Sequence, residues 1–176
     1  MQRIVIVGTT GSGKSTLAKQ LGDKLGLVHI DLDDLHHLPG WQERPIDDFR
    51  KLLTEAIRVE KWVVAGNYQN RAQDIVWPAA DTFVWLDMPY WSNFWRLLKR
   101  TLRRAYTGEL ICNGNTENLF MQFFTQDSIL LWFFKTWPKN RKRYSAIFDK
   151  PQDYPHLKLI RLRSDEQRQE FLDKAG

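Results

Sequence analysis

Residues 8–16 read GTTGSGKST and directly follow the apolar run of residues 4–7. The stretch contains, in this order, a glycine, four residues, a second glycine, a lysine and a serine. A strand pattern precedes it and a helix pattern follows it. The glycines let the backbone curl with its N–H groups pointing inward, and the positive end of the following helix adds to the field. The pattern predicts a phosphate-binding loop made of Gly8, Thr9, Thr10, Gly11, Ser12, Gly13, Lys14, Ser15 and Thr16.

The spacing of this loop assigns chemistry to two of its side chains. We expect Lys14 to reach the β- and γ-phosphates of a nucleotide and the Ser15 hydroxyl to bind Mg²⁺. The alternative is a chance match on an ordinary strand–turn–helix, which at ~7% glycine arises in roughly one chain in a hundred of this length. The sequence therefore predicts ATP and Mg²⁺ as cofactors, although these residues do not distinguish ATP from GTP.

Composition limits the class of protein. The chain has 176 residues, the size of one domain, with 43% hydrophobic and 27% charged residues. The longest apolar run, residues 129–134, is too short for a membrane span, and no secretory leader is apparent. Cys112 is the only cysteine, which excludes an internal disulfide and a cysteine zinc site. These features predict a cytoplasmic protein without a membrane partner.

The charge is positive, with a formal net value of +5 and a pI of about 9.4. This balance by itself admits nucleic acid, a membrane surface or an anionic small molecule as a partner. No zinc-finger spacing and no RNA-binding aromatic signature is present, so no motif indicates nucleic acid.

Five short apolar segments read as strands: 3–7, 28–31, 62–65, 82–86 and 157–162. They lack the alternation of a half-exposed sheet, which favours a parallel sheet covered on both faces. Helix patterns occupy 15–25, 46–59, about 89–106, the segment after Asp127 or Ser128, and the segment after Ser164. We expect Gly108 to stop the third helix and Pro138 to kink or end the fourth. The alternation predicts one doubly wound α/β domain over residues 1–176.

Two acids close the second predicted strand. Asp31 and Asp33 lie two residues apart, on one side of an extended chain, at the sheet edge where ligands bind. We predict that Asp33 holds Mg²⁺ through water or acts on an acceptor, and that Asp31 contributes to the acceptor site. The alternative is that Asp33 or Asp34 only caps the next helix. His36 and His37 are adjacent and make a poor metal pair, so we expect surface or loop positions for both.

Further candidates follow the third and fourth strands. Gly66 permits a close backbone approach, and Asn67 and Arg71 lie within reach of the same edge. Asp87 is a candidate carboxylate that we interpret as a cap of the helix after it. Trp41 either stacks on a bound base or sugar or packs on the helix that starts near Ile46.

Two basic clusters stand out. Arg96, Arg100, Arg103 and Arg104 largely share one helix face, and residues 141–143 form the second cluster. We expect the opposite face of the first helix to be buried through Trp91, Phe94, Trp95, Leu98 and Leu102. Phosphoryl transfer needs positive charge converging on the moving group, which these arginines would supply. The alternative is a solvated or nucleic-acid-binding face. Residues 107–117 read as a mobile flap or a plain surface loop.

Several segments spread over nearly the whole chain match a known family of proteins. They are RIVIVGTTGSGKSTLAKQL, LVHIDLDDLHHLPGW, KWVVAGNY, ADTFVWLD, RTLRR with GEL and NGNTEN, and DSILLW. Through them the chain resembles nucleoside-monophosphate-kinase-type P-loop proteins. More closely, it is similar to the adenylate-kinase-related group often labelled "DNA topology modulation protein". The resemblance implies a three-layer P-loop NTPase fold with a five-stranded parallel sheet of order 2-3-1-4-5, helices on both faces and a short helical lid. It implies an acceptor-side segment at about 32–60 and a lid at about 96–126.

The resemblance also implies an ATP- and Mg²⁺-dependent phosphotransferase. Arg100 and Arg104 match the R-x-x-x-R spacing of the family's lid arginines. Residues 141–143 match a later R-K-R, which makes Arg141 a candidate to hold the acceptor. Arg71 is a second candidate, in place of the arginine of the family's D-G-F-P-R segment. The family's D-G-F-P-R segment matches only at Gly66, which counts against AMP as the acceptor. If the acceptor is a hydroxyl compound, Asp33 is the candidate base. The alternatives are a nucleotide-dependent regulatory or nucleic-acid-binding protein, or a simple ATPase.

Overall fold

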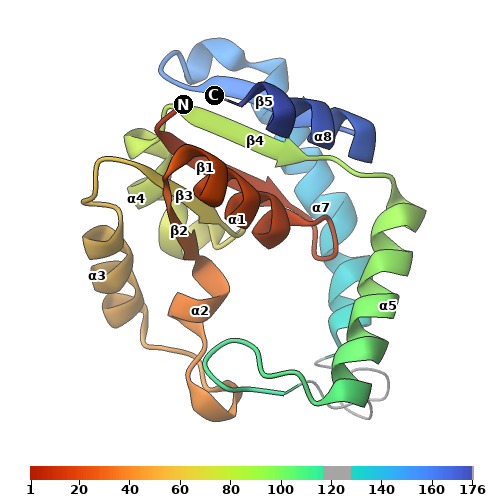
Figure 1. Cartoon of the computed structure of the whole chain (residues 1–176). Coiled ribbons are helices and arrows are strands. Elements are labelled where there is room, and N and C mark those ends of the chain that lie inside the picture. The colour runs from red at the N-terminus through yellow and green to blue at the C-terminus, as the bar shows by residue number, and fades with distance from the viewer. Residues whose placement is uncertain (117–127, 176) are drawn as a thin grey trace.

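A parallel sheet of five strands runs through the centre of the computed structural model, which describes residues 1–116 and 128–175 (Figure 1). The strands are β1 (Arg3–Gly8), β2 (Val28–Asp31), β3 (Trp62–Ala65), β4 (Thr82–Leu86) and β5 (Lys158–Leu162). Their spatial order is β2-β3-β1-β4-β5, and Val5 pairs with Val64 of β3 and Phe83 of β4. All of β3 and β4 and nearly all of β1 are buried, which explains their uniformly apolar sequences. The predicted fold and strand order are confirmed.

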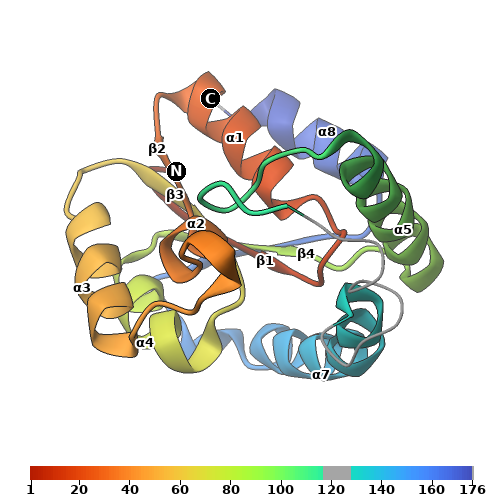
Figure 2. The ribbon, with the colours of Figure 1, turned by 90° about the horizontal axis from the view of Figure 1, so that it is seen from below.

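Helices cover both faces of this sheet (Figure 2). One face carries α1 (Lys14–Leu25) and α8 (Asp165–Lys174); the other carries α3 (Ile46–Ala56), α4 (Gln69–Ala79) and α7 (Ile129–Asp149). Alternate residues of β1 serve the two cores: Ile4 and Ile6 pack with α1, and Val5 and Val7 pack with α3, α4 and α7. Each such side chain contributes about 1.5–3 kcal/mol by its burial.

Two helices stand beyond the carboxyl ends of the strands and flank that edge of the sheet (Figure 1). α2 (Leu32–His36) follows β2 without a break, and α5 (Tyr90–Thr107) follows β4. Gly108 ends α5 in the left-handed conformation, with φ 63°, as predicted. Ser128 caps α7 and Ser164 caps α8 through their hydroxyl oxygens, also as predicted. Residues 117–126 of the predicted lid lie outside the described residues.

The prediction for the buried face of α5 is wrong. Its buried residues are Asn93, Leu97 and Thr101, whereas Trp91 and Trp95 are 64% and 53% exposed. The reason is the phosphate loop, because a Cβ on Gly11 would lie 2.7 Å from the Asn93 carbonyl oxygen. The phosphate loop approaches α5 so closely that only the side with Asn93, Leu97 and Thr101 can lie against it. The side with Trp91 and Trp95 is therefore exposed.

Of the two expected effects of Pro138, to kink or to end the helix, the second is wrong, because α7 continues to Asp149. Phe133 before the proline and Tyr144 and Ile147 after it are all buried. Burial of both halves offsets the cost of about 3 kcal/mol that a proline imposes inside a helix. In the described part of the chain, no helix combines the length and the hydropathy that a membrane span requires.

Candidate active site

The predicted phosphate loop connects β1 to α1 as a tight curl. Gly8, Gly11 and Gly13 have φ values of 154°, 81° and 92°, which residues other than glycine rarely adopt. A Cβ on Gly8 would also lie 2.7 Å from Ser12 Oγ and 2.9 Å from the Leu86 carbonyl oxygen. Because Gly13 is the N-cap of α1 and has no side chain, the first N–H groups of the helix keep their capacity for a phosphate.

Lys14 lies inside this curl, where its Nζ donates to the Thr9 carbonyl oxygen at 3.3 Å. Burial lowers the pKa of Lys14; the charges of Asp33 and Asp31 oppose this shift, and the charge of Arg100 adds to it. The structure thus brings four predicted site residues within electrostatic reach of one another. A poorly solvated ammonium interacts strongly with an approaching phosphate.

The Ser15 hydroxyl lies close enough to the Asp31 carboxylate to favour its charged form. Asp31 Oδ1 also accepts from the Asp33 N–H at 3.0 Å, which makes Asp31 the N-cap of α2. The alternative in which Asp33 or Asp34 is the cap is therefore wrong. Burial and the neighbouring Asp33 raise the pKa of Asp31. A hydroxyl and two carboxylates beside a phosphate loop are hard oxygen donors and fit Mg²⁺.

The spacing of Asp31 and Asp33 predicted that both lie on an extended chain. Asp33 lies instead in the first turn of α2. Its Oδ1 accepts a hydrogen bond of 2.8 Å from the hydroxyl of Tyr68, which directly precedes α4. Burial and the charge of Asp33 raise the pKa of Tyr68, so the phenol keeps its proton and remains a donor. No local sequence pattern marks Tyr68 except its place after Gly66 and Asn67 at a strand end.

Gly66 and Asn67 make contacts within the chain itself. A Cβ on Gly66 would lie 2.7 Å from Leu32 Cβ, so glycine allows α2 to pack onto the end of β3. The Asn67 side chain exchanges two hydrogen bonds with the backbone of Gly8 and accepts a third from the Tyr144 hydroxyl. Both residues thus join the phosphate loop and α2 to the sheet.

A second group of side chains extends from Tyr68 away from the phosphate loop. The buried His36 ring lies 4.7 Å from the Tyr68 ring, centroid to centroid, and its Nδ1 lies 3.2 Å from Arg71 Nη1. Burial, His37 and Arg71 lower the pKa of His36, which favours a neutral ring that accepts from Arg71. Arg71 Nη2 donates to Glu43 Oε2 at 2.9 Å. The expected surface or loop position of His36 is wrong.

Residues 111–116 form a hairpin, which a bridge between Ile111 and Asn115 closes. Trp41 donates from its backbone to Asn115 Oδ1 at 2.9 Å and from Nε1 to the Thr116 carbonyl oxygen at 3.1 Å. Asn113 Nδ2 donates to the carbonyl oxygens of Asp34 and His37. The 111–116 hairpin is therefore bound to α2 and the turn after it, and both views show it beside α2 (Figures 1 and 2).

The arginines of α5 have different partners. Arg96 pairs with Asp165 of α8, and Arg103 lies 2.8 Å from Glu109. Arg104 Nε lies 3.4 Å from Glu109 Oε1, and Arg100 acts electrostatically on Lys14. The predicted catalytic Arg100 thus interacts electrostatically with the phosphate loop.

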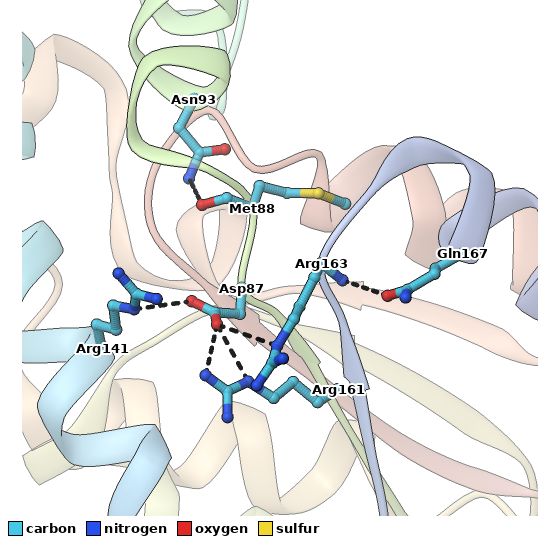
Figure 3. Close-up of polar contacts among 7 residues, drawn as sticks. All are labelled: Asp87, Met88, Asn93, Arg141, Arg161, Arg163 and Gln167. Atoms are coloured by element: carbon cyan, nitrogen blue, oxygen red, sulfur yellow. Dashed lines mark hydrogen bonds and ion pairs between the residues drawn. The ribbon is translucent and has the colours of Figure 1, made fainter.

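Asp87 follows β4 at the same edge of the sheet, and its side chain is only 6% exposed (Figure 3). Arg161 donates to Oδ2 from Nε at 3.0 Å and from Nη2 at 2.7 Å. Arg141 Nε lies 3.5 Å from Oδ1 and Arg163 Nε lies 3.9 Å from Oδ2. Pro89 occupies the N-cap position of α5, so the interpretation of Asp87 as a cap is wrong. A buried carboxylate requires such guanidinium partners.

Comparisons with known proteins connect this geometry to a family. A family model described as AAA domain matches residues 4–109. Protein YqaC of Bacillus subtilis is 30% identical over 116 residues, which are 65% of this chain and 64% of that protein. A bifunctional pantoate ligase/cytidylate kinase of Gloeobacter violaceus is 39% identical over 80 residues, 42% of this chain and 15% of that protein. A probable gluconokinase of Schizosaccharomyces pombe is 53% identical over 32 residues, 18% of this chain and 17% of that protein. The chain spans less than two thirds of the length of each of these relatives.

A solved structure gives the fold. Shikimate kinase from Bacteroides thetaiotaomicron superposes with a TM-score of 0.52 at 17% sequence identity, over 98% of this chain and 95% of that one. The strand order β2-β3-β1-β4-β5, with helices on both faces, is that of the P-loop kinase fold.

Proposed function

The chain belongs to the AAA-domain family of P-loop proteins, and we propose that it is an ATP- and Mg²⁺-dependent kinase for a small-molecule hydroxyl group. One observation carries the proposal. Asp33, which accepts a hydrogen bond from Tyr68, lies within electrostatic reach of Lys14 in the phosphate loop. A carboxylate beside the lysine that binds the γ-phosphate is the arrangement that a hydroxyl acceptor requires.

The donor side would hold ATP through residues 8–16, with Lys14, Arg100 and Arg104 stabilising the charge of the transferred group. Ser15 directly and Asp33 through water would hold Mg²⁺, which supplies positive charge to the β- and γ-phosphate oxygens when bound. We take residues 1–176 as one kinase domain, with its acceptor-side segment at about 32–60 and its lid at about 96–126.

On the acceptor side, Asp33 would accept the proton of the attacking hydroxyl. The hydroxyl oxygen forms a bond to the γ-phosphorus as the bond to the β–γ bridging oxygen breaks, and ADP leaves with that electron pair. Because Tyr68 occupies Oδ1, Asp33 presents Oδ2 to the acceptor. We assign the walls of this site to Asp31, Trp41, Gly66, Asn67, Arg71 and Arg141.

Two relatives support phosphoryl transfer, since their names denote a cytidylate kinase and a gluconokinase. The resemblance of the sequence to adenylate-kinase-related proteins is compatible with phosphoryl transfer. No described contact favours a role in DNA topology.

The test is ADP production from Mg·ATP, alone and with mixtures of nucleosides, hexoses and nucleoside monophosphates. We expect ADP release to require an acceptor, and Asp33→Asn to lower kcat by about 10²–10⁴-fold. Asp47→Asn, an exposed acid in the first turn of α3, is the matched control and should leave the rate unchanged. ADP release that ignores every acceptor would identify an ATPase, and binding of ATP without any turnover would identify a regulatory module.

A further inference from the structure

The acceptor side of the site is the acidic part of a basic chain. Residues 32–60 contain seven Asp and Glu residues against four Lys and Arg residues, whereas the whole chain has a formal charge of +5. Asp33, Asp34 and Glu43 are all exposed on this side. Carboxylates therefore outnumber basic groups in the acceptor-side segment.

Arg71, in the first turn of α4 after Tyr68, forms an ion pair on this side of the site. Arg71 donates to Glu43 at 2.9 Å, and its other terminal nitrogen lies against the His36 ring. Glu43 is 61% exposed and Arg71 is 32% exposed, so the pair lies at the surface of the site and not in the core. An anionic acceptor would have to compete with Glu43 for this guanidinium.

Neighbouring arginines are engaged as well. Arg44 Nε donates to the Leu35 carbonyl oxygen at 2.8 Å. Arg50 makes a bidentate pair with Asp74, with distances of 2.9 and 2.6 Å. Arg141, the remaining acceptor candidate, lies 3.5 Å from Asp87, a carboxylate that it shares with Arg161 and Arg163. Each of these cations has a partner within the chain.

We infer that the acceptor carries no phosphate or carboxylate group and is a neutral or amine-bearing hydroxyl compound, with Glu43 as the residue that determines this specificity. The inference rests on the proposed kinase function. Asp34, together with the charge of Asp31 and Asp33 that bound Mg²⁺ does not offset, repels an anion, whereas an amine gains from the same carboxylates.

The experiment compares three acceptor mixtures at equal concentration with Mg·ATP. The neutral mixture contains nucleosides and hexoses, the amine mixture contains hexosamines and amino alcohols, and the anionic mixture contains nucleoside monophosphates and hexonic acids. We expect the neutral or the amine mixture to stimulate ADP production at least about 10-fold more than the anionic mixture. Stimulation chiefly by the anionic mixture overturns the inference but leaves the kinase intact. If no mixture stimulates ADP production, the proposed function itself fails.

A variant tests the assigned residue. Glu43→Gln removes the charge that neutralises Arg71, and the ratio of kcat/KM for anionic over neutral acceptors should rise on the order of 10-fold. Glu60→Gln, an exposed acid just before β3, is the matched control and should leave that ratio unchanged. An unchanged ratio in Glu43→Gln, or an equal rise in both variants, overturns the assignment of Glu43.

Discussion

Asn67 and Gly8 are joined by a reciprocal pair of hydrogen bonds. The Gly8 N–H donates to Asn67 Oδ1 at 3.1 Å, and Asn67 Nδ2 donates to the Gly8 carbonyl oxygen at 2.7 Å. The Tyr144 hydroxyl donates to the same Oδ1 at 3.0 Å, so α7 is tied to this side chain as well. One amide thus fixes the point at which the phosphate loop leaves the sheet.

Replacing Asn67 by alanine removes all three of these hydrogen bonds. We expect the free energy of unfolding to fall by about 2–4 kcal/mol, and Mg·ATP to bind about 10-fold more weakly because the loop loses its anchor. Denaturant unfolding and calorimetric titration measure the two effects. Asn70→Ala, exposed on α4, is the control and should change stability by less than about 0.5 kcal/mol. Equal losses in both variants would contradict the anchoring role.

The hydroxyl of Tyr68 can be removed without removing its ring. In Tyr68→Phe, Asp33 loses the bond that orients its carboxylate, so we expect kcat to fall about 10-fold while the Kd for Mg·ATP stays the same. Steady-state kinetics with an acceptor and nucleotide titration provide the comparison. Tyr154→Phe, in which a tyrosine packed on Trp77 is changed, should behave as wild type. A rise in KM at constant kcat would instead make Tyr68 only a wall of the site.

The buried Lys14 makes stability depend on pH. Burial lowers its pKa from 10.5, so between the lowered value and 10.5 the unfolded chain binds more protons at this position than the folded chain. The contribution of Lys14 to the free energy of unfolding therefore rises with pH across that window. At about pH 7, Lys14→Met should stabilise the nucleotide-free protein, and this gain should shrink towards about pH 10.

Urea unfolding without nucleotide at the two pH values measures this gain. Lys19→Met on the same helix, where the lysine is exposed and paired with Asp23, should change stability by less than about 0.5 kcal/mol at both. Loss of stability at neutral pH in Lys14→Met would show that the charges of Asp31 and Asp33 outweigh burial.

Gly66 offers a comparison of two causes of strain. An alanine there would place Cβ 2.7 Å from Leu32 Cβ at a φ of 150°, and we expect a loss of about 2–3 kcal/mol. Gly26 also has a positive φ, 65°, but apart from Gly26 itself and its chain neighbours, no heavy atom of the described residues lies within 4 Å of a Cβ built there. Gly26→Ala should therefore cost only about 1 kcal/mol. Equal losses in thermal unfolding would mean that backbone conformation alone sets the cost.

The sequence predicts the strands well because their signal is local. β1, β3 and β4 are buried on both faces, so runs such as Ile4 to Val7 mark them without help from distant residues. The buried face of α5 was not predictable in this way. Its largest apolar side chains point outward because Gly11, far away in the sequence, demands close contact with Asn93 and Leu97.

The site also has parts with a local sequence pattern and parts that depend on contacts distant in sequence. The phosphate loop is a contiguous pattern, and the structure brings Lys14, Asp31, Asp33 and Arg100 near one another. The pair of Tyr68 and Asp33 spans 35 residues, and the pair of Arg71 and Glu43 spans 28. Neither pair has a local signature, because each is created by the parallel ordering of β2 beside β3. Asp87 was misjudged because its position suggests a cap, whereas Arg161, which donates twice to its Oδ2, lies 74 residues later in the neighbouring strand β5.

The distance of 74 residues in sequence between Asp87 and Arg161 has a consequence for biosynthesis. When the ribosome has translated β4, the four strands β1 to β4 are complete, but Asp87 still lacks the guanidinium groups that neutralise it. The edge of β4 stays open to solvent until Arg161 has been added and β5 can pair with it. The five-stranded sheet therefore stays incomplete until β5 has been translated, and pairing of β4 with β5 follows that point.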